Sequence, residues 1–146
     1  MCIRDRIIDW SKTKNLQPHA VPVPLLAAEL IESIRPNEYG WYFPSAKDPS
    51  KPVSHGTLYS FVWRQRDRGV IPYATNRDLR RTFKTLAGKA GVPKEIRDRL
   101  QNHALQDVSS KHYDRWHYMV EKRAGMAKWD KFVRSMLAKK RLKLAA

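Results

Sequence analysis

Residues 75–100, TNRDLRRTFKTLAGKAGVPKEIRDRL, contain the signals of two consecutive helices. Thr75 followed by Asp78 is typical of a helix start, and Gly91 is typical of a helix end. Pro93 is typical of the first turn of the next helix. Apolar residues recur at helical spacing and predict the buried face of both helices: Leu79, Phe83, Leu86, Ala87, Ala90, Ile96 and Leu100.

The opposite face of the first of these helices is basic, with Arg77, Arg80, Arg81 and Lys84. Positions three and four apart on a helix lie side by side, so these cations form a compact patch near the helix start. Guanidinium groups match phosphate oxygens bidentately, and helix N-termini also favour anions. The patch therefore predicts phosphate binding, with a solvated basic face as the alternative.

The rest of the chain predicts further helices and a small sheet. Apolar runs at residues 7–10 and 20–23 flank a basic connection and predict a β-hairpin. We expect a helix from Pro24 to about Ile34, and a packed loop over residues 36–52, which is rich in Pro, Gly, Ser and aromatic residues.

Three more helices are expected after that loop. Ser54 would cap one with Leu58, Phe61 and Val62 facing inward. A short helix starting at residue 107 or 109 would contain His112 and Tyr113. The last would span residues 120–138, with an inward stripe of Ala124, Ala127, Phe132, Val133, Met136 and Leu137. The fold class is therefore mainly α with a small β-hairpin (α+β).

Composition restricts the function. The 146 residues contain 29 Lys and Arg against 14 Asp and Glu, a formal charge of +15 that favours a polyanionic partner such as nucleic acid. A single cysteine excludes a disulfide framework within the chain and fits a reducing compartment. No apolar run approaches the roughly 20 residues that span a bilayer, so we expect no membrane association.

Several segments, in order, resemble the tyrosine recombinases (phage integrases) of the prophage branch. Residues 77–82, RDLRRT, resemble their H-x-L-R-R-T box, and residues 100–103, LQNH, resemble their L-G-H box. Residues 111–115, KHYDR, resemble the nucleophile segment. Residues 121–124 and Trp129 resemble the start of the last helix in this branch of the family. Residues 13–15 and 18–22 resemble the β-hairpin that holds the family's catalytic lysine.

The resemblance implies a partial recombinase catalytic domain over residues 7–138, with 1–6 as a leader outside the fold and 139–146 as a basic tail. It also implies that the hydroxyl of Tyr113 attacks a DNA phosphate and forms a 3′-phosphotyrosine. Arg80 and His103 would contact the phosphate, and Lys14 would protonate the leaving oxygen. The covalent bond conserves the energy for rejoining, so neither a metal nor another cofactor is expected.

Two departures from the family pattern stand out. The box residue that is His in the family is Arg77 here, which can bind phosphate but cannot act as a base. The family's first catalytic arginine lies upstream of the hairpin and has no counterpart, since Arg4 and Arg6 are too close to the strand. Loss of one phosphate clamp costs about 10²–10³ in rate, so we expect this chain alone to be weak or inactive.

Some assignments stay open. Tyr118 is the alternative nucleophile, and Lys12 is the alternative to Lys14. Further DNA contacts are expected from Arg81, Lys84, Arg64 and Arg97. The last helix either packs in its own domain or docks on a neighbouring copy.

The resemblance implies double-stranded DNA as the partner, a tetramer assembled on it, and a cytoplasmic, nucleoid-associated location in a prokaryotic or phage-infected cell. Competing functions are a non-catalytic DNA-binding module on the same scaffold and a relaxing topoisomerase. An RNA-binding protein is a further alternative, based on charge alone.

Overall fold

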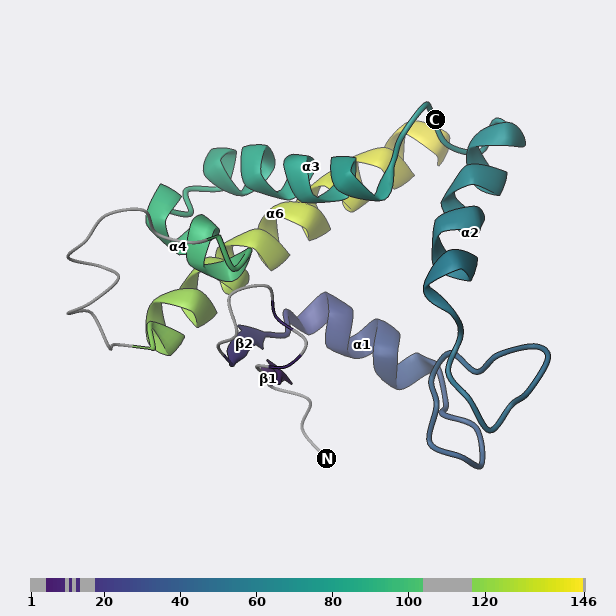
Figure 1. Ribbon diagram of the computed structural model, residues 1–146. Helices are drawn as coiled ribbons and strands as arrows, with labels where there is room; N and C mark the ends of the chain where they lie inside the picture. Colours follow the sequence, from purple (N-terminus) through teal and green to yellow (C-terminus); the bar gives the residue numbers. More distant parts are fainter. Residues whose placement is uncertain (1–4, 10, 12, 14–17, 104–116, 146) are drawn as a thin grey trace. The chain divides into compact units, whose positions relative to one another are not determined.

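The structure, a computed structural model, describes residues 5–9, 11, 13, 18–103 and 117–145. This part of the chain is mostly helical, with one two-stranded antiparallel sheet, in agreement with the expected α+β class (Figure 1). Its elements are β1 (Asp5–Ile8), β2 (His19–Pro22), α1 (Leu25–Ser33), α2 (His55–Asp67), α3 (Asn76–Lys89), α4 (Lys94–Leu100) and α6 (Met119–Ala145).

The chain divides into two compact units. One comprises residues 1–28 and 84–146, and the other comprises residues 29–83. The first contains the sheet, α4, α6 and the second half of α3, whereas the second contains the loop after α1, α2 and the start of α3.

The two strands pair from Asp5 opposite Pro22 to Ile8 opposite His19. The hairpin is confirmed, but β1 begins two residues earlier than the expected run and therefore includes Asp5 and Arg6. The ring of His19 is buried, and its Nε2 lies 3.2 Å from the carbonyl oxygen of Leu100. This contact ties the first residue of β2 to the end of α4 and accounts for a strand that starts at the polar residue His19.

The turn between α3 and α4 follows the sequence signals closely. Gly91 takes a φ of 80°, and its N–H donates to the Gly88 carbonyl at 3.0 Å. The N–H of Val92 donates to the Ala87 carbonyl at 2.9 Å, which completes a Schellman motif. The chain therefore reverses at a residue that tolerates positive φ without strain.

The apolar core of the first unit lies at this turn. Among the described residues, Ala87, Val92, Ile96 and Leu100 form this buried apolar core. A Cβ on Gly125 of α6 would lie 3.1 Å from Val92 and 3.2 Å from Ile96, so α6 approaches α4 closely at that position. The inward position expected for Ile96 and Leu100 is confirmed.

Helix α6 differs from expectation in its length and in its buried face. It continues to Ala145, through the residues expected to form a basic tail. Its buried residues are Lys122, Gly125 and Asp130. The expected inward stripe is wrong at Ala124, Ala127, Met136 and Leu137, which are exposed, while Phe132 and Val133 are partly buried. The close approach at Gly125 and the hydrogen bonds of the polar residues decide which face is covered.

The second unit has little apolar burial around α2. Ser54 caps this helix as expected, since its hydroxyl accepts the N–H of Thr57 at 3.2 Å. Phe61, expected to face inward, is 54% exposed, and Leu79 at the start of α3 is 67% exposed. Both expectations are wrong because helical periodicity does not show whether a neighbouring element covers the face.

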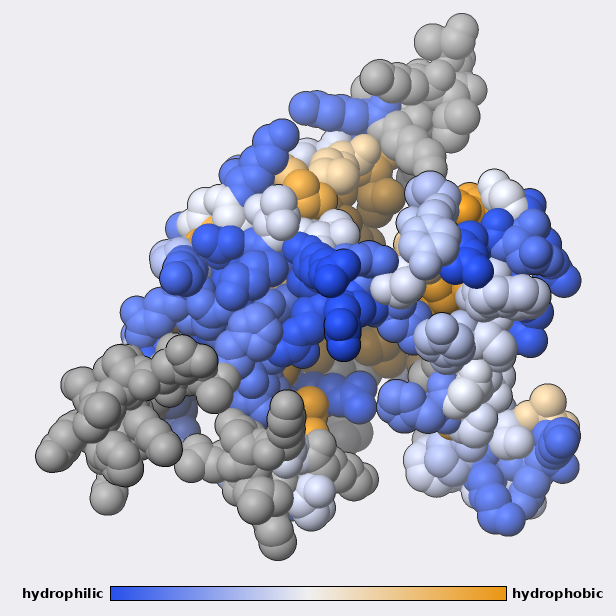
Figure 2. Space-filling model, turned by 45° about the horizontal axis from the view of Figure 1, so that its top comes forward, coloured by the Kyte–Doolittle hydropathy of each residue, from blue (hydrophilic) through white to orange (hydrophobic). Residues whose placement is uncertain are grey.

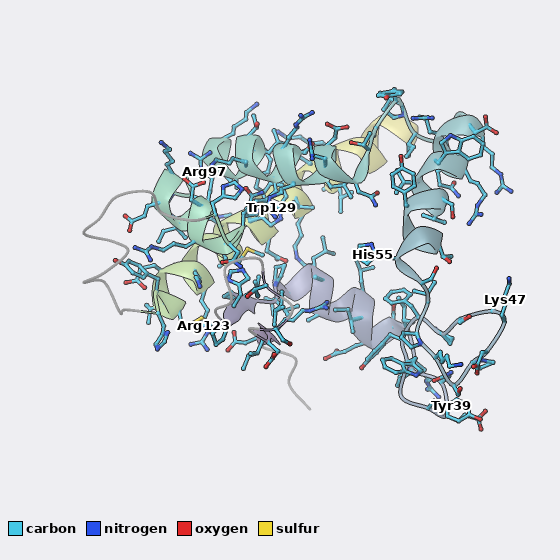
Figure 3. The ribbon with its side chains drawn as sticks, viewed as in Figure 1. Tyr39, Lys47, His55, Arg97, Arg123 and Trp129 are labelled. Carbon is cyan, nitrogen blue, oxygen red and sulfur yellow. The ribbon has the colours of Figure 1, made fainter. Side chains whose placement is uncertain are left out.

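The loop before α2 is held by Asn37. Its side-chain Oδ1 accepts the N–H groups of Tyr39 and Trp41 at 3.1 and 3.0 Å, and its Nδ2 donates to the Pro49 carbonyl at 2.8 Å. Tyr39 and Lys47 lie at two outer tips of this loop (Figure 3). The loop is ordered by polar bonds, although Tyr39, Trp41, Tyr42 and Phe43 are exposed.

Candidate phosphate-binding site

The basic face of α3 begins at a polar cap. The backbone N–H and the hydroxyl of Thr75 donate to Asp78 Oδ2 at 2.9 and 2.7 Å, which confirms the expected start signals. Arg81 donates to the other oxygen, Asp78 Oδ1, at 3.0 Å. The Thr75 bonds and then Arg81 lower the pKa of Asp78 below its usual value. Asp78 thus stays ionised, secures the helix start and holds Arg81 on the helix surface.

The three arginines of this face, Arg77, Arg80 and Arg81, are all exposed on the first turns of α3. Lys84 lies one turn after Arg80 on the same helix and is partly buried. The face of the molecule in Figure 2 is largely hydrophilic, in keeping with the high count of Lys and Arg. Arg80 and its neighbours therefore offer exposed guanidinium groups of the kind that bind phosphate.

In the first unit, Lys84 meets two side chains from the α4 region. Its ammonium forms an ion pair with the carboxylate of Asp98. His103 Nδ1 lies 3.0 Å from the same oxygen, Asp98 Oδ1, and 3.4 Å from Lys84 Nζ. We call Lys84, Asp98 and His103 the α3–α4 triad. The side chain of Asp98 is 14% exposed, against 33% for Lys84 and 38% for His103. Two partly exposed nitrogen donors thus surround a nearly buried carboxylate.

The protonation of this triad follows from its contacts. Burial raises the pKa of Asp98, but the hydrogen bonds from Lys84 and His103 outweigh it and leave the pKa below the usual value. An ionised carboxylate only accepts hydrogen bonds, so the ring of His103 donates through Nδ1. The Nδ1 atom cannot then accept from Lys84, which donates to the carboxylate instead. The geometry therefore favours a His103 ring with its proton on Nδ1.

The end of α4 places His103 beside Asp98. The N–H of Asn102 donates to the Arg99 carbonyl at 3.2 Å, and the N–H of His103 donates to the Asp98 carbonyl at 2.9 Å. Asn102 adopts a φ of 52° to allow this. It precedes His103 where the family box has glycine, and asparagine is the residue after glycine that best tolerates this conformation.

Arg97, expected to contact DNA, is instead used within the unit. Its guanidinium donates to the Lys84 carbonyl and lies on Gly88, where an added Cβ would be 2.8 Å from Nη1. Arg97 is on α4 in Figure 3. This contact ties α4 to the backbone of α3 at the residue that bears the triad's ammonium. Arg64, the other expected contact outside α3, is exposed in the last turn of α2.

The remaining expected catalytic groups, Tyr113 and Lys14, lie outside the described residues, as does Lys12. Tyr118, the alternative nucleophile, is described. Its ring lies under the guanidinium of Arg99, with 3.5 Å from Arg99 Cζ to the ring centroid, and its carbonyl accepts the N–H of Lys122 at the start of α6. The contacts of Tyr118 are thus those of a residue at a helix start.

Sequence reasoning missed two polar residues of the first unit. Asp98 is one of several charged residues in its segment, although its place five residues before His103 is typical of a pair joined across a helix end. Lys122 is buried, its Nζ donates to the Ala20 carbonyl of β2 at 3.2 Å, and burial, followed by the charge of Arg99, lowers its pKa. No local pattern distinguishes Lys122 from the other lysines of α6.

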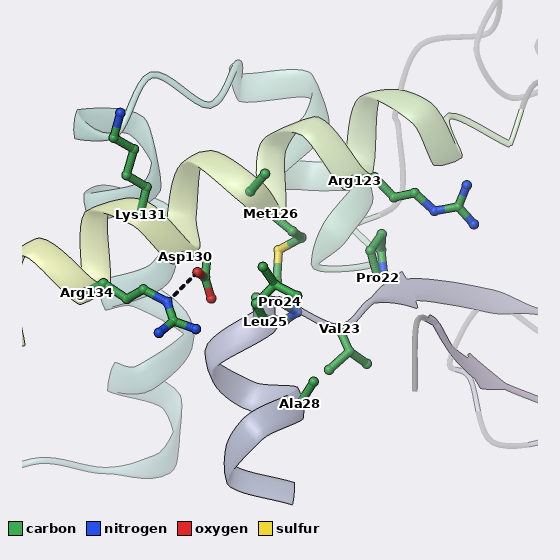
Figure 4. A pocket seen from close by; sticks show the side chains of 11 residues that line it. Pro22, Val23, Pro24, Leu25, Ala28, Arg123, Met126, Asp130, Lys131 and Arg134 are labelled. Carbon is green, nitrogen blue, oxygen red and sulfur yellow. Dashed lines mark hydrogen bonds and ion pairs between the residues drawn. The ribbon is translucent and has the colours of Figure 1, made fainter. Parts of the chain in front are cut away.

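A groove of about 560 Å³ lies between β2, the start of α1 and α6. Met126 projects from α6 toward Pro24 and Leu25, and Asp130 bonds to Arg134 beside them (Figure 4). Asp130 also accepts the N–H of Leu26 at 2.7 Å, which anchors the start of α1. The groove is mainly apolar with basic residues at its rim, namely Arg123, Lys131 and Arg134.

Within the described ranges, no three His, Cys, Asp or Glu side chains gather as metal ligands would. No helix in the same part of the chain has the length and apolar character that a membrane span requires. Comparisons with family models, curated proteins and solved structures found no match to this chain.

Proposed function

We propose that the chain is part of the catalytic domain of a tyrosine recombinase, which cuts and rejoins DNA through a 3′-phosphotyrosine. The observation that supports it best is the α3–α4 triad, whose Lys84 lies on the same helix as Arg77, Arg80 and Arg81. The two boxes that resemble the family, residues 77–82 and 100–103, contribute to this helix and to the triad, respectively. Phosphate chemistry needs cationic donors of this kind.

The chemistry assigns a role to each residue. The hydroxyl of Tyr113 attacks the phosphorus and gives its proton to solvent water, a new bond forms between the phenolic oxygen and phosphorus, and the bond from phosphorus to the 5′-oxygen of the next nucleotide breaks. Arg80 and His103 stabilise the negative charge that grows on the non-bridging oxygens. Lys14 gives a proton to the leaving oxygen. A free tyrosine has a pKa near about 10, so the cations also favour loss of its proton.

Arg77 takes the place of the box histidine and remains protonated near neutral pH. In this proposal it is a second guanidinium that binds phosphate, and it does not accept the proton of Tyr113. The proposal also includes double-stranded DNA as substrate, assembly of four copies on that DNA, and a location beside the nucleoid in the cytoplasm of a prokaryotic or phage-infected cell.

The test is covalent trapping on DNA. The chain is incubated for hours with labelled duplexes that have a randomised core and a nick, so that the released fragment diffuses away and resealing is blocked. We expect a denaturation-resistant adduct that forms slowly, persists in Tyr118→Phe and is absent in Tyr113→Phe. An adduct that persists in Tyr113→Phe contradicts the assigned nucleophile.

The second candidate function is a non-catalytic DNA-binding module. The observation that favours it is Arg77, since an arginine at the box position retains phosphate affinity while removing a possible proton acceptor. Duplex binding with a steep salt dependence, and no adduct with any nicked substrate, supports this alternative over the recombinase.

A further inference from the structure

The carboxylate of Asp98 is the common partner of two nitrogen donors. Lys84 and His103 contact the same oxygen, Oδ1. Lys84 precedes Asp98 in the sequence and lies on α3, whereas His103 follows it and lies just after α4. Their nitrogen atoms are 3.4 Å apart. If both nitrogens carry protons, neither can accept from the other, and the carboxylate that accepts from each of them holds them at this separation.

We infer that Asp98 is a positioning residue: its carboxylate fixes the ring of His103 through Nδ1 and holds the ammonium of Lys84 beside it as a second phosphate donor. This inference rests on the proposed function, since it assigns the phosphate to this site. It adds Asp98 as a positioning residue and places Lys84, already expected to contact DNA, beside His103 at the phosphate.

The contacts indicate how the positioning works. Asp98 is the least exposed member of the triad, so a phosphate approaches the lysine and the histidine before it reaches the carboxylate. With Nδ1 bonded to Asp98, the ring points its other nitrogen, Nε2, away from the carboxylate, and Nε2 donates to a phosphate oxygen in the protonated ring, in which both nitrogens carry a proton. A histidine whose Nδ1 is bonded to a carboxylate is fixed in both tautomer and orientation. Asp98 from α4 and Lys84 from α3 both lie against Nδ1 of the ring.

Arg97 supports the same arrangement through the backbone of Lys84. Its guanidinium bonds the carbonyl of Lys84, so α4 holds both the backbone and the side chain of that residue. A purely structural role for Asp98, as a link between α3 and α4, is the competing explanation. The two roles differ in what they predict for the ring of His103 and for the balance between DNA binding and cleavage.

The first measurement needs no mutation. In protein labelled with ¹⁵N at histidine, two-bond ¹⁵N–¹H spectra give the tautomer of His103 at a pH where its ring is neutral. We expect the proton on Nδ1 in the wild-type chain and a shift toward the Nε2–H tautomer in Asp98→Asn. A wild-type ring with its proton on Nε2 overturns the inference.

The second measurement separates binding from cleavage. Asp98→Asn raises the net charge by one, so binding to duplex DNA is expected to be unchanged or slightly tighter. The rate of adduct formation should nevertheless fall about 10- to 100-fold, the range seen when a carboxylate that orients a metal-bound histidine is removed. Glu95→Gln, which removes a carboxylate paired with Arg99 on the same helix, is the matched control and should keep the wild-type rate.

The outcomes distinguish this inference from the proposed function. Adduct formation by the wild-type chain tests the recombinase, while the tautomer measurement tests the positioning of His103 whether or not an adduct forms. An Asp98→Asn variant that cleaves at the wild-type rate overturns the inference and leaves the recombinase standing. If Asp98→Asn does not fold, the wild-type tautomer decides.

Discussion

Asp98 holds His103 at two points: its carbonyl accepts the backbone N–H at 2.9 Å, and its carboxylate lies 3.0 Å from the ring Nδ1. One residue of α4 therefore sets both the path of the chain after the helix and the direction of the imidazole. The backbone bond forms only because Asn102, between them, adopts positive φ. The geometry of the triad thus depends on a residue that makes no contact with phosphate in the proposed site.

Substitution of Asn102 tests this dependence. At a φ of 52° a β-branched residue is strained, so Asn102→Val should lower the free energy of unfolding by about 1–2 kcal/mol. Asn102→Gly adopts the same conformation without strain and should stay close to the wild type. Urea denaturation measures both, and equal stability of the two variants would contradict the role of the backbone conformation.

The pH dependence of stability should report on Asp130. Burial raises its pKa, but the Leu26 N–H and Arg134 lower it further, so the folded value lies below the ordinary 3.8. When folding lowers the pKa of a carboxyl, its contribution to the free energy of unfolding is complete at any pH above the pKa of the unfolded state. That contribution is lost as the pH falls through the pKa of the folded state. We expect Asp130→Asn to cost about 1–3 kcal/mol at neutral pH.

The same argument predicts how that cost changes in acid. As the pH falls from about 5 to below 3.8, the wild type loses the contribution of Asp130 and the variant has none to lose. The difference in unfolding free energy between them should therefore shrink. Thermal or urea unfolding across this range measures it, and a difference that stays constant with pH would show that Asp130 acts through packing alone.

The sequence predicts those features that depend on neighbouring residues in the chain. Ser54 caps α2, Thr75 and Asp78 begin α3, and Gly91 ends it, because each signal is satisfied by backbone groups within a few residues. The hairpin follows from two apolar runs around a basic connection, and the structure shifts the strand ends by only one or two residues.

Features that depend on distant segments were not predictable in the same way. The buried face of α6 is set by the contact of Gly125 with α4 and by the bond of Asp130 to the start of α1, which lies over 100 residues away. Leu79 and Phe61 show the reverse case: both belong to a periodic apolar stripe, yet more than half of each residue's surface is exposed. The partnership of Asp98 with Lys84 joins two helices and has no signature in either one.

The contact between α6 and α4 can be tested at Gly125. A Cβ there would lie 3.1 and 3.2 Å from Val92 and Ile96, so a larger side chain must displace core residues. We expect Gly125→Leu to lower the free energy of unfolding by about 1–3 kcal/mol, although leucine favours helix more than glycine does. The control is Gly56→Leu on α2, where the nearest atom is 3.8 Å away and no loss is expected.

The basic face of α3 should determine the salt dependence of DNA binding. Each lysine or arginine that neutralises a phosphate releases counterions and steepens the slope of log affinity against log salt by roughly 0.9. The double variant Arg77→Gln with Arg80→Gln removes two exposed guanidinium groups from this face. We expect weaker duplex binding and a slope that is shallower by nearly twice that amount, measured by fluorescence anisotropy at several salt concentrations.

A matched double variant distinguishes direct phosphate binding from overall charge. Lys47→Gln with Lys51→Gln removes the same two charges from the loop before α2, where Lys51 is already paired with Asp48 at 2.8 Å. Charges outside the DNA interface affect binding only through the long-range field, which is screened beyond about 10 Å at 0.1 M salt. The loop variant should therefore keep a slope near that of the wild type. Equally shallow slopes in the two double variants would mean that net charge, and not a phosphate-binding face on α3, governs the affinity.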